Sequence, residues 1–195
     1  MVSNKPYVTG KRLFDFFAAL CALIVLSAPL LIIAVVIKLT SRGPVIHWSR
    51  RIGRNNTIFL MAKFRTMRID TPQVATHLLE NPDRYVTPIG RFLRKFSLDE
   101  LPQLLNIIKG DISVVGPRPA LFNQDDLREL RTRRGIHALM PGLTGWAQIN
   151  GRDELSIPVK VQLDEYYLLH MSFLFDIKII LLTITKVLKK EGITH

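Results

Sequence analysis

The sequence predicts an α+β protein that is mostly helical, with an N-terminal membrane helix, interfacial amphipathic helices and a small β element. Three observations lead to this prediction: an uncharged apolar run at 16–37, apolar residues at helical spacing later in the chain, and two short apolar segments around 54–56. At 195 residues the chain suits one compact domain with an appendage. We therefore divide it into an anchor, 1–40, and a domain, 41–195.

The composition indicates an anionic partner. The net charge of +11 and the pI near 10.2 favour nucleic acid, anionic lipid or phosphorylated small molecules. The mean hydropathy of +0.19 is high for a soluble protein, and the apolar excess is concentrated near the N-terminus. Cys21 is the only cysteine, which excludes an intrachain disulfide and gives no sign of an oxidising compartment.

The apolar run from Phe16 to Ile37 carries no charge and is long enough to cross a bilayer core. A signal peptide fits poorly, because the run is too long and no small-residue cleavage site follows it. Pro29 interrupts the helix, and Ser27 is placed to bind carbonyl groups that the break frees. We expect this segment to stay on the protein as its anchor.

Basic residues flank the anchor on both sides. Lys11 and Arg12 precede it, and Lys38 and Arg42 follow it. Because lysine and arginine are retained on the cytoplasmic side, a helix that bends at Pro29 and returns to the same face explains both flanks. An ordinary kinked span is the alternative, and these features alone do not choose between them.

The rest of the chain alternates short extended and helical patterns. The segments on either side of Arg54-Asn55-Asn56 predict a hairpin or a pair of extended segments. The polar stretch 68–87 predicts a short helix between loops, and 141–152 is typical of an ordered loop.

Three later segments show helical periodicity. The first has an apolar stripe of Leu101, Leu104, Leu105 and Ile108, ended by Lys109-Gly110. The second is 158–170. The third, 176–190, is basic and amphipathic, and it fits either the headgroup region of an anionic membrane or a helix packed on the domain. Its predicted apolar side consists of Ile177, Ile180, Leu181, Ile184, Val187 and Leu188.

Two adjacent carboxylates, Asp99 and Glu100, lie at a predicted helix start, where free N–H groups and the helix dipole favour acids. Ser97 and Glu100 match a capping box, which explains Glu100 structurally and leaves Asp99 unexplained. With Arg94 nearby, we expect the pKa of Asp99 to be depressed. An ionised carboxylate there would suit a nucleophile or a magnesium ligand.

Several cations surround this pair in the sequence. Arg118 lies in a Gly-Pro-Arg-Pro turn, where two prolines pre-organise a guanidinium to bind phosphate bidentately. Lys63 and Arg65 alternate with apolar residues, so in a strand both lie on one face, and a solvated face explains them equally well. Arg152 and Asp164 are weak signals by themselves. The histidines show no metal-ligand spacing, and nucleotide-loop and nucleophile-elbow motifs are absent.

Taken as an ordered set, these motifs resemble the bacterial sugar transferase family, the monotopic polyprenol-phosphate phosphoglycosyl transferases, in their small form that corresponds to the minimal catalytic unit. The resemblance covers nearly the whole chain. Its motifs are KRLFDF at 11–16, the proline-broken helix, the segment from GPVIHW to FRTM, RFLRKFSLDELPQLLNIIKGDISVVGPRP at 91–119, PGLTGWAQINGR at 141–152 and LDEYYLLHMSFLFDIKIILLTITKVLK.

The resemblance implies a transfer of sugar-1-phosphate from a UDP-sugar to undecaprenyl phosphate, with Mg²⁺ and release of UMP, as the first membrane step of glycoconjugate synthesis. Asp99 would attack the phosphorus attached to the sugar and form a covalent phosphosugar intermediate. Glu100 would be its partner, and both are candidate metal ligands. The candidate substrate and phosphate-binding residues are Lys63, Arg94, Arg118, Arg152 and Asp164.

The resemblance also implies a location. The family's anchor is a re-entrant helix broken at proline, in the bacterial inner membrane, with the catalytic domain on the cytoplasmic face. We expect Ser27, Pro29, Lys11 and Arg12 to serve the anchor, although the family often has serine directly before the proline and this chain has Ala28. Anionic lipid is an expected partner, nucleic acid is not, and a homodimer is compatible with the sequence. We favour an N-acetylated or deoxy-amino sugar as the transferred group.

Two other interpretations compete with this one. A non-catalytic, membrane-anchored protein that binds anionic lipid explains the charge and the apolar segment, but not an acidic pair framed by arginines. A transferase that moves the sugar alone would release UDP instead of UMP.

Overall fold

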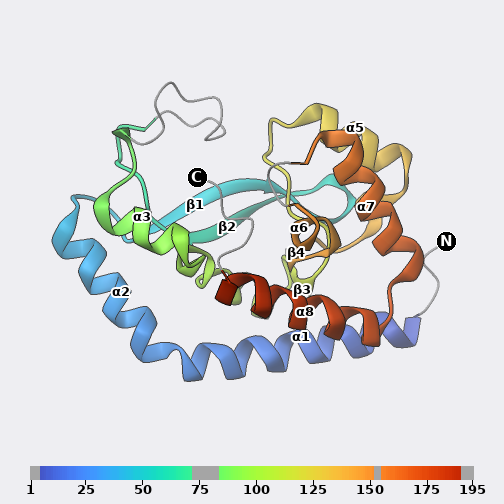
Figure 1. Ribbon diagram of the computed structural model, residues 1–195, viewed down its shortest axis with the longest axis horizontal. Coiled ribbons are helices and arrows are strands. Elements are labelled where there is room, and N and C mark those ends of the chain that lie inside the picture. Colours follow the sequence, from blue (N-terminus) through green and yellow to red (C-terminus); the bar gives the residue numbers. More distant parts are fainter. Residues whose placement is uncertain (1–4, 72–83, 152–154, 190–195) are drawn as a thin grey trace.

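The computed structural model describes residues 5–71, 84–151 and 155–189 (Figure 1). Within these ranges helices dominate and the strands form two small sheets, which confirms the predicted α+β class. The helices are α1 Lys5–Val25, α2 Ser27–Thr40, η1 Arg54–Asn56, α3 Pro88–Lys95, η4 Leu98–Glu100, α4 Gln103–Lys109, α5 Asp125–Arg133, η5 Ile136–Ala138, α6 Trp146–Ile149, α7 Ile157–His170 and α8 Phe173–Lys189. The strands are β1 Ile46–Ile52, β2 Ile58–Phe64, β3 Ser113–Val115 and β4 Gly142–Thr144.

The anchor is a bent pair of helices. Helices α1 and α2 meet at an angle of 64°, and the Ser27 hydroxyl donates to the Ile24 carbonyl at 2.8 Å, as its place beside the break predicts. No single described helix is long and apolar enough to cross a membrane, whereas the bent pair meets both criteria together. Large apolar side chains along the pair are exposed: Phe17, Ile24, Val25, Leu31, Ile32 and Leu39.

The first sheet is the predicted hairpin. Strands β1 and β2 pair antiparallel, from Ile46 opposite Phe64 to Ile52 opposite Ile58. The turn between them places Asn55 and Asn56 at positive φ, of 54° and 60°. Asparagine tolerates this conformation better than most residues, so the Asn-Asn pair gives the turn its local signal.

The second sheet pairs β3 parallel to β4, with Ser113 opposite Gly142. The segment 141–152 therefore contains a strand and the short helix α6, and the prediction of a loop is wrong there. The two backbones approach so closely that a Cβ on Gly142 would lie 2.1 Å from the Gly116 nitrogen. This close approach explains the glycines, which resemble loop residues when only the local sequence is considered.

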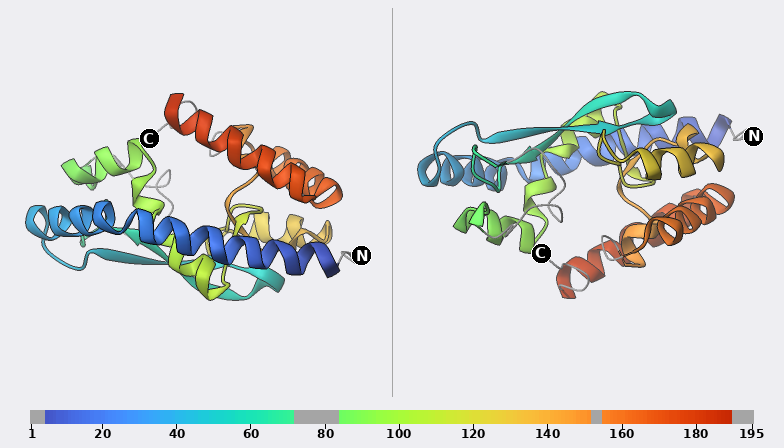
Figure 2. Two further views of the ribbon diagram at one scale, coloured as in Figure 1. Left: turned by 90° about the horizontal axis from the view of Figure 1, so that it is seen from below. Right: turned by 90° about the horizontal axis from the view of Figure 1, so that it is seen from above.

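Helix α7 confirms the predicted helix at 158–170, but the apolar stripes of α4 and α8 differ from prediction. In α4 Leu104 and Ile107 are buried, whereas Leu105 is half exposed. In α8 Ile179 is fully buried, whereas the predicted stripe residues Leu181 and Ile184 are exposed. Helix α8 contacts α1 at its start, where the Phe173 ring packs against Phe14, and the two helices diverge from there (Figure 2). Because α8 carries apolar residues on more than one face, periodicity did not identify the packed face.

The polar stretch 68–87 is described only at its ends. Met67 and Val86 form an antiparallel bridge, and the Arg68 N–H donates to the Tyr85 carbonyl at 2.9 Å. The short helix predicted between them lies mostly outside the described residues. Helix α3 then begins after Thr87, whose hydroxyl accepts a hydrogen bond from the Gly90 N–H as an N-cap.

Candidate active site

Asp99 and Glu100 lie in η4, between α3 and α4, and each is 8% exposed. Ser97 precedes them in a left-handed conformation, with φ of 54°, and its hydroxyl makes no capping hydrogen bond. The predicted capping box is therefore wrong. The Glu100 carboxylate instead contacts cations from distant parts of the chain, which a local pattern does not reveal.

The Glu100 carboxylate binds two of the predicted cations. Its Oε1 accepts hydrogen bonds from Lys63 Nζ and from Arg118 Nη2, each at 2.8 Å. Lys63 comes from β2 and Arg118 from the turn after β3, so the contacts join three separate segments. Burial lowers the pKa of Lys63, and the negative charge of Glu100 opposes this shift. Glu100 thus fixes an ammonium and a guanidinium at one point.

Asp99 differs from its neighbour. No hydrogen bond to its carboxylate occurs among the described residues, and nearby cations act on it only through their charge. Burial raises the pKa of Asp99, and the attraction of Lys63 opposes the shift. The expected depression of this pKa is therefore wrong in direction, because desolvation outweighs the cations. Asp99 keeps oxygen lone pairs available for chemistry.

Arg94 approaches the pair from the last turn of α3. Its Nε donates to the Thr66 hydroxyl at 3.0 Å, which orients the guanidinium. Its charge favours ionised Asp99, although burial lowers the pKa of Arg94. The predicted cation therefore lies beside the predicted carboxylate, without a hydrogen bond between the two.

Asp164 is linked to the site indirectly, through Arg131, for which the sequence gave no signal. Arg131, on α5, donates from Nε at 3.0 Å and from Nη2 at 2.6 Å to Asp164 Oδ2. Its Nη1 donates to the Arg118 carbonyl at 2.8 Å. Asp164 is only 1% exposed and supports the turn of Arg118 by way of Arg131. The α5 sequence DDLRELRTR is typical of a solvated helix, so local sequence gave no signal for Arg131.

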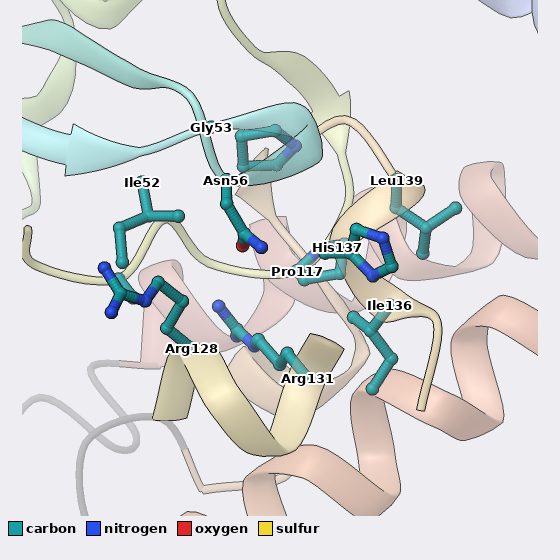
Figure 3. Close-up of a pocket in the computed structure, with 11 residues that line it drawn as sticks. Ile52, Gly53, Asn56, Pro117, Arg128, Arg131, Ile136, His137 and Leu139 are labelled. Carbon is teal, nitrogen blue, oxygen red and sulfur yellow. The ribbon is translucent and has the colours of Figure 1, made fainter. Parts of the chain in front are cut away.

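A small cavity lies beside this support (Figure 3). Pro117 and Arg131 contribute to its wall, and its volume is about 30 Å³. This is room for one or two water molecules, and a nucleotide is far larger. Asp99 and Glu100 do not line it, so the cavity is not where the carboxylates would meet a substrate.

The hairpin contributes two further residues that sequence reasoning missed. His47 is directly opposite Lys63, and burial followed by the charge of Lys63 lowers the pKa of His47. Arg51 lies on the same face, and its Nη1 donates to the Pro119 carbonyl at 3.3 Å. The alternation of β1 would have placed both near Lys63. Arg65 instead lies beyond β2 and donates to the carbonyls of Ser41 and Arg42.

The other predicted site residues have different environments. Lys11 Nζ donates to Asp176 Oδ2 at 2.6 Å, and Arg12 donates to the Ile107 and Ile108 carbonyls, so both bind the domain. Arg152 lies outside the described residues. Among the residues that the structure describes, no group of three or more histidine, cysteine or acidic side chains is placed to hold a metal ion. A metal here would rest on Asp99 and Glu100 with ligands from a substrate.

Asp99 and Glu100 thus form a buried acidic pair with Lys63, Arg94 and Arg118 close by, and cations of this kind suit a phosphate ligand. The chain belongs to the bacterial sugar transferase family, whose model matches residues 6–190. It is 46% identical over 184 residues to the uncharacterized sugar transferase EpsL of Bacillus subtilis, covering 94% of this chain and 89% of that protein.

Two further relatives show how this chain compares in length. The exopolysaccharide production protein ExoY of Rhizobium meliloti is 41% identical over 200 residues, covering 94% of this chain and 87% of that protein. The UDP-glucose:undecaprenyl-phosphate glucose-1-phosphate transferase of Escherichia coli is 41% identical over 184 residues. That match covers 90% of this chain but only 39% of the longer protein.

Proposed function

We propose that this chain transfers sugar-1-phosphate from a UDP-sugar to undecaprenyl phosphate. The observation that carries the proposal is the buried Asp99 carboxylate, which accepts no hydrogen bond among the described residues and lies beside cations fixed by Glu100. The name of the Escherichia coli relative, a UDP-glucose:undecaprenyl-phosphate glucose-1-phosphate transferase, supports the substrate classes.

The reaction has two steps. In the first, an Asp99 oxygen attacks the phosphorus attached to the sugar, an oxygen–phosphorus bond forms, and the bond to UMP breaks with its electron pair leaving on UMP. In the second, a phosphate oxygen of the lipid attacks the same phosphorus and releases the Asp99 carboxylate. The products are undecaprenyl-diphosphate-sugar and UMP. A carboxylate oxygen with an available lone pair can act as the nucleophile of the first displacement and as the leaving group of the second.

The cations have separate tasks. Arg118 and Lys63, held by Glu100, would stabilise the charge that develops on the diphosphate, and Arg94 would favour ionised Asp99. Mg²⁺ usually takes one or two carboxylates together with substrate phosphates, and the Asp99–Glu100 pair fits this ligand set. When bound there, Mg²⁺ would neutralise negative charge on the diphosphate.

We place the protein in the bacterial inner membrane, with α1 and α2 as a re-entrant anchor and the site on the cytoplasmic face. The 64° bend, the exposed apolar side chains and the basic residues on both flanks support this location. Exposed Leu174, Leu181 and Ile184 with the lysines of α8 fit an anionic lipid surface.

Pro29→Ala should straighten the anchor, and the accessibility of an N-terminal tag measures the topology. If the N-terminus stays cytoplasmic in both wild type and Pro29→Ala, Pro29 does not determine the topology.

Nucleotide release tests the function. Purified protein in detergent is mixed with undecaprenyl phosphate, Mg²⁺ and a panel of UDP-sugars that includes glucose, N-acetylated and deoxy-amino forms. Lipid-dependent formation of UMP with one donor supports the proposal and identifies the sugar. Release of UDP would indicate transfer of the sugar alone. If no donor leads to nucleotide release, and Asp99→Asn binds lipid as well as wild type does, the protein would be a non-catalytic binding protein.

A further inference from the structure

Helix α1 presents a row of polar side chains to the domain, in the KRLFDF motif that the proposed chemistry does not use. Arg12 and Asp15 are three positions apart, so they share one face of the helix. Asp15 is only 2% exposed. A buried charge in a helix of mainly apolar composition needs strong partners, and those partners show what the face does.

Arg12 holds the C-terminal end of α4. Its guanidinium donates to the Ile107 carbonyl and, at 2.8 Å, to the Ile108 carbonyl. These groups belong to the last turn, where carbonyls lack helical partners and a cation is favoured. Gly110 ends the helix at a φ of 97°, and a Cβ there would lie 3.0 Å from Arg12 Nη2. The glycine thus also leaves room for the guanidinium.

Asp15 holds the start of β3. Its Oδ2 accepts a hydrogen bond from the Ser113 hydroxyl at 2.7 Å, and its Oδ1 accepts one from the Val114 N–H at 3.2 Å. Ala19, one turn further on, is fully buried against Ile107 and Ile112. The small side chain lets α1 approach the bend between α4 and β3 closely. Figure 2 shows α1 passing along this part of the domain.

The contacts of Arg12 and Asp15 lie in the middle of residues 98–118, which we call the catalytic segment. Asp99 and Glu100 precede α4, and Arg118 follows β3, so residues 98–118 run out from the acidic pair, bend, and return to it. The return closes at the 2.8 Å contact between Arg118 and Glu100. A rigid helix and a strand held at their shared bend fix the relative positions of their far ends.

We propose that Arg12 and Asp15 are positioning residues for the first step of the reaction, the one that needs no lipid. They set Arg118 and the acidic pair relative to one another by holding the bend between α4 and β3. The anchor is then part of the catalytic framework and not only a tether. This inference rests on the proposed function, since it concerns the same site.

The test measures the lipid-independent step in full-length protein in detergent. With saturating UDP-sugar and no undecaprenyl phosphate, the single-turnover release of nucleotide is followed, and intact mass reports the phosphosugar adduct. Asp15→Ala should slow this step at least tenfold while the donor KM changes less than threefold. Asp15→Asn should retain most of the rate, because its amide can accept from the Val114 N–H and donate to the Ser113 oxygen.

Tyr7→Phe is the matched control. It removes a 2.8 Å hydrogen bond from the same helix to Asp176 on α8, which carries no residue of the site. Its first-step rate should stay within twofold of wild type. A purely structural role predicts instead that the rates of both variants follow their melting temperatures, and that result would overturn the inference. A wild-type rate for Asp15→Ala would do the same.

A second variant and a separate criterion for wild type complete the test. If Asp15→Ala does not fold, Ser113→Ala removes one of the two contacts, and a first-step rate equal to wild type would count against the inference. The proposed function is judged on wild type alone. If wild type releases UMP with no donor, the proposed function is wrong. If wild type is active and Asp15→Ala is unaffected, only the role proposed for the anchor is wrong.

Discussion

Two groups of buried carboxylates, one between α1 and the domain and one in η4, differ in how their oxygens are satisfied. Between α1 and the domain, Asp15 accepts a hydrogen bond at each oxygen, and Asp176 accepts one from Tyr167 at Oδ1 and two at Oδ2. In η4, Glu100 accepts two hydrogen bonds at one oxygen, while Asp99 accepts none from the described residues.

The difference separates a structural role from a chemical one. Burying a carboxylate costs free energy that hydrogen bonds and ion pairs offset, so Asp15 and Asp176 hold other elements in place without offering an oxygen for reaction. A buried Asp99 without such bonds is held at a cost to stability, which is a feature of sites organised for reaction. Our proposal of Asp99 as the nucleophile therefore rests on burial together with the absence of donors among the described residues, and not on burial alone.

The largest expected effect comes from Asp99→Asn. Loss of the nucleophile should lower turnover at least about a hundredfold. The melting temperature in detergent should stay the same or rise, because the variant removes a buried carboxylate whose desolvation outweighs the attraction of the nearby cations. Nucleotide release and thermal unfolding on the same preparation measure both. Residual turnover above a few per cent, free of wild-type contamination, would rule Asp99 out.

Glu100→Gln should reduce turnover by about a hundredfold, which is the usual effect of losing a pre-organised electrostatic group. Here the melting temperature should fall, because Lys63 and Arg118 lose their shared charge partner while Lys63 stays largely buried. Adding Lys63→Met to Glu100→Gln should recover part of the melting temperature and none of the turnover. Recovery of both would place Glu100 among the structural carboxylates.

The pH dependence of the first step gives the next effect. Burial raises the pKa of Asp99, so the rate should rise with pH until Asp99 is ionised, by about tenfold per pH unit below that pKa. Stability has the opposite sign. An acid with a raised folded-state pKa binds its proton more tightly when folded, so stability falls as pH rises from the unfolded pKa through the folded one. Asp99→Asn should remove that part of the stability profile, and identical profiles would contradict the assignment.

The features of the fold and site that could be predicted from the sequence are those that depend on residues close together in the chain. Short-range patterns succeeded: the apolar runs around Arg54–Asn56 gave the hairpin, and Pro29 with Ser27 gave the break in the anchor. The acidic pair was proposed as the site because helix starts and arginine-rich surroundings are local signals, and its catalytic role stays a prediction. Each of these depends on residues within a turn or two of each other.

Long-range contacts account for what was missed. The capping box failed because Lys63 and Arg118, distant in sequence, contact Glu100. The pKa of Asp99 was predicted in the wrong direction because burial is a property of the folded chain. Arg131 had no local signal, since its partners come from α7 and from the turn after β3.

A smaller effect is expected for Asp164→Asn. Arg131 would lose its charge partner and hold the Arg118 carbonyl less firmly, so turnover should fall about fivefold, mainly in kcat. Steady-state kinetics with the donor varied measures this. The conservative variant Arg131→Lys can keep only one of the three hydrogen bonds and should show a similar loss. An increase in donor KM alone would indicate that Asp164 contacts substrate directly.

The smallest effect on turnover should come from Asp176→Asn, in the group of satisfied carboxylates. The variant removes the charge partner of Lys11, and its single amide oxygen can accept from only one of the two tyrosine hydroxyls, because Tyr167 donates to Oδ1 and Tyr7 to Oδ2. Turnover should stay within about twofold, because no reacting group is touched, whereas the melting temperature should fall by roughly 5–10 °C. Thermal unfolding and nucleotide release in the same detergent separate the two quantities. If turnover fell as far as in Glu100→Gln, satisfied and unsatisfied carboxylates would not divide structure from chemistry in this protein.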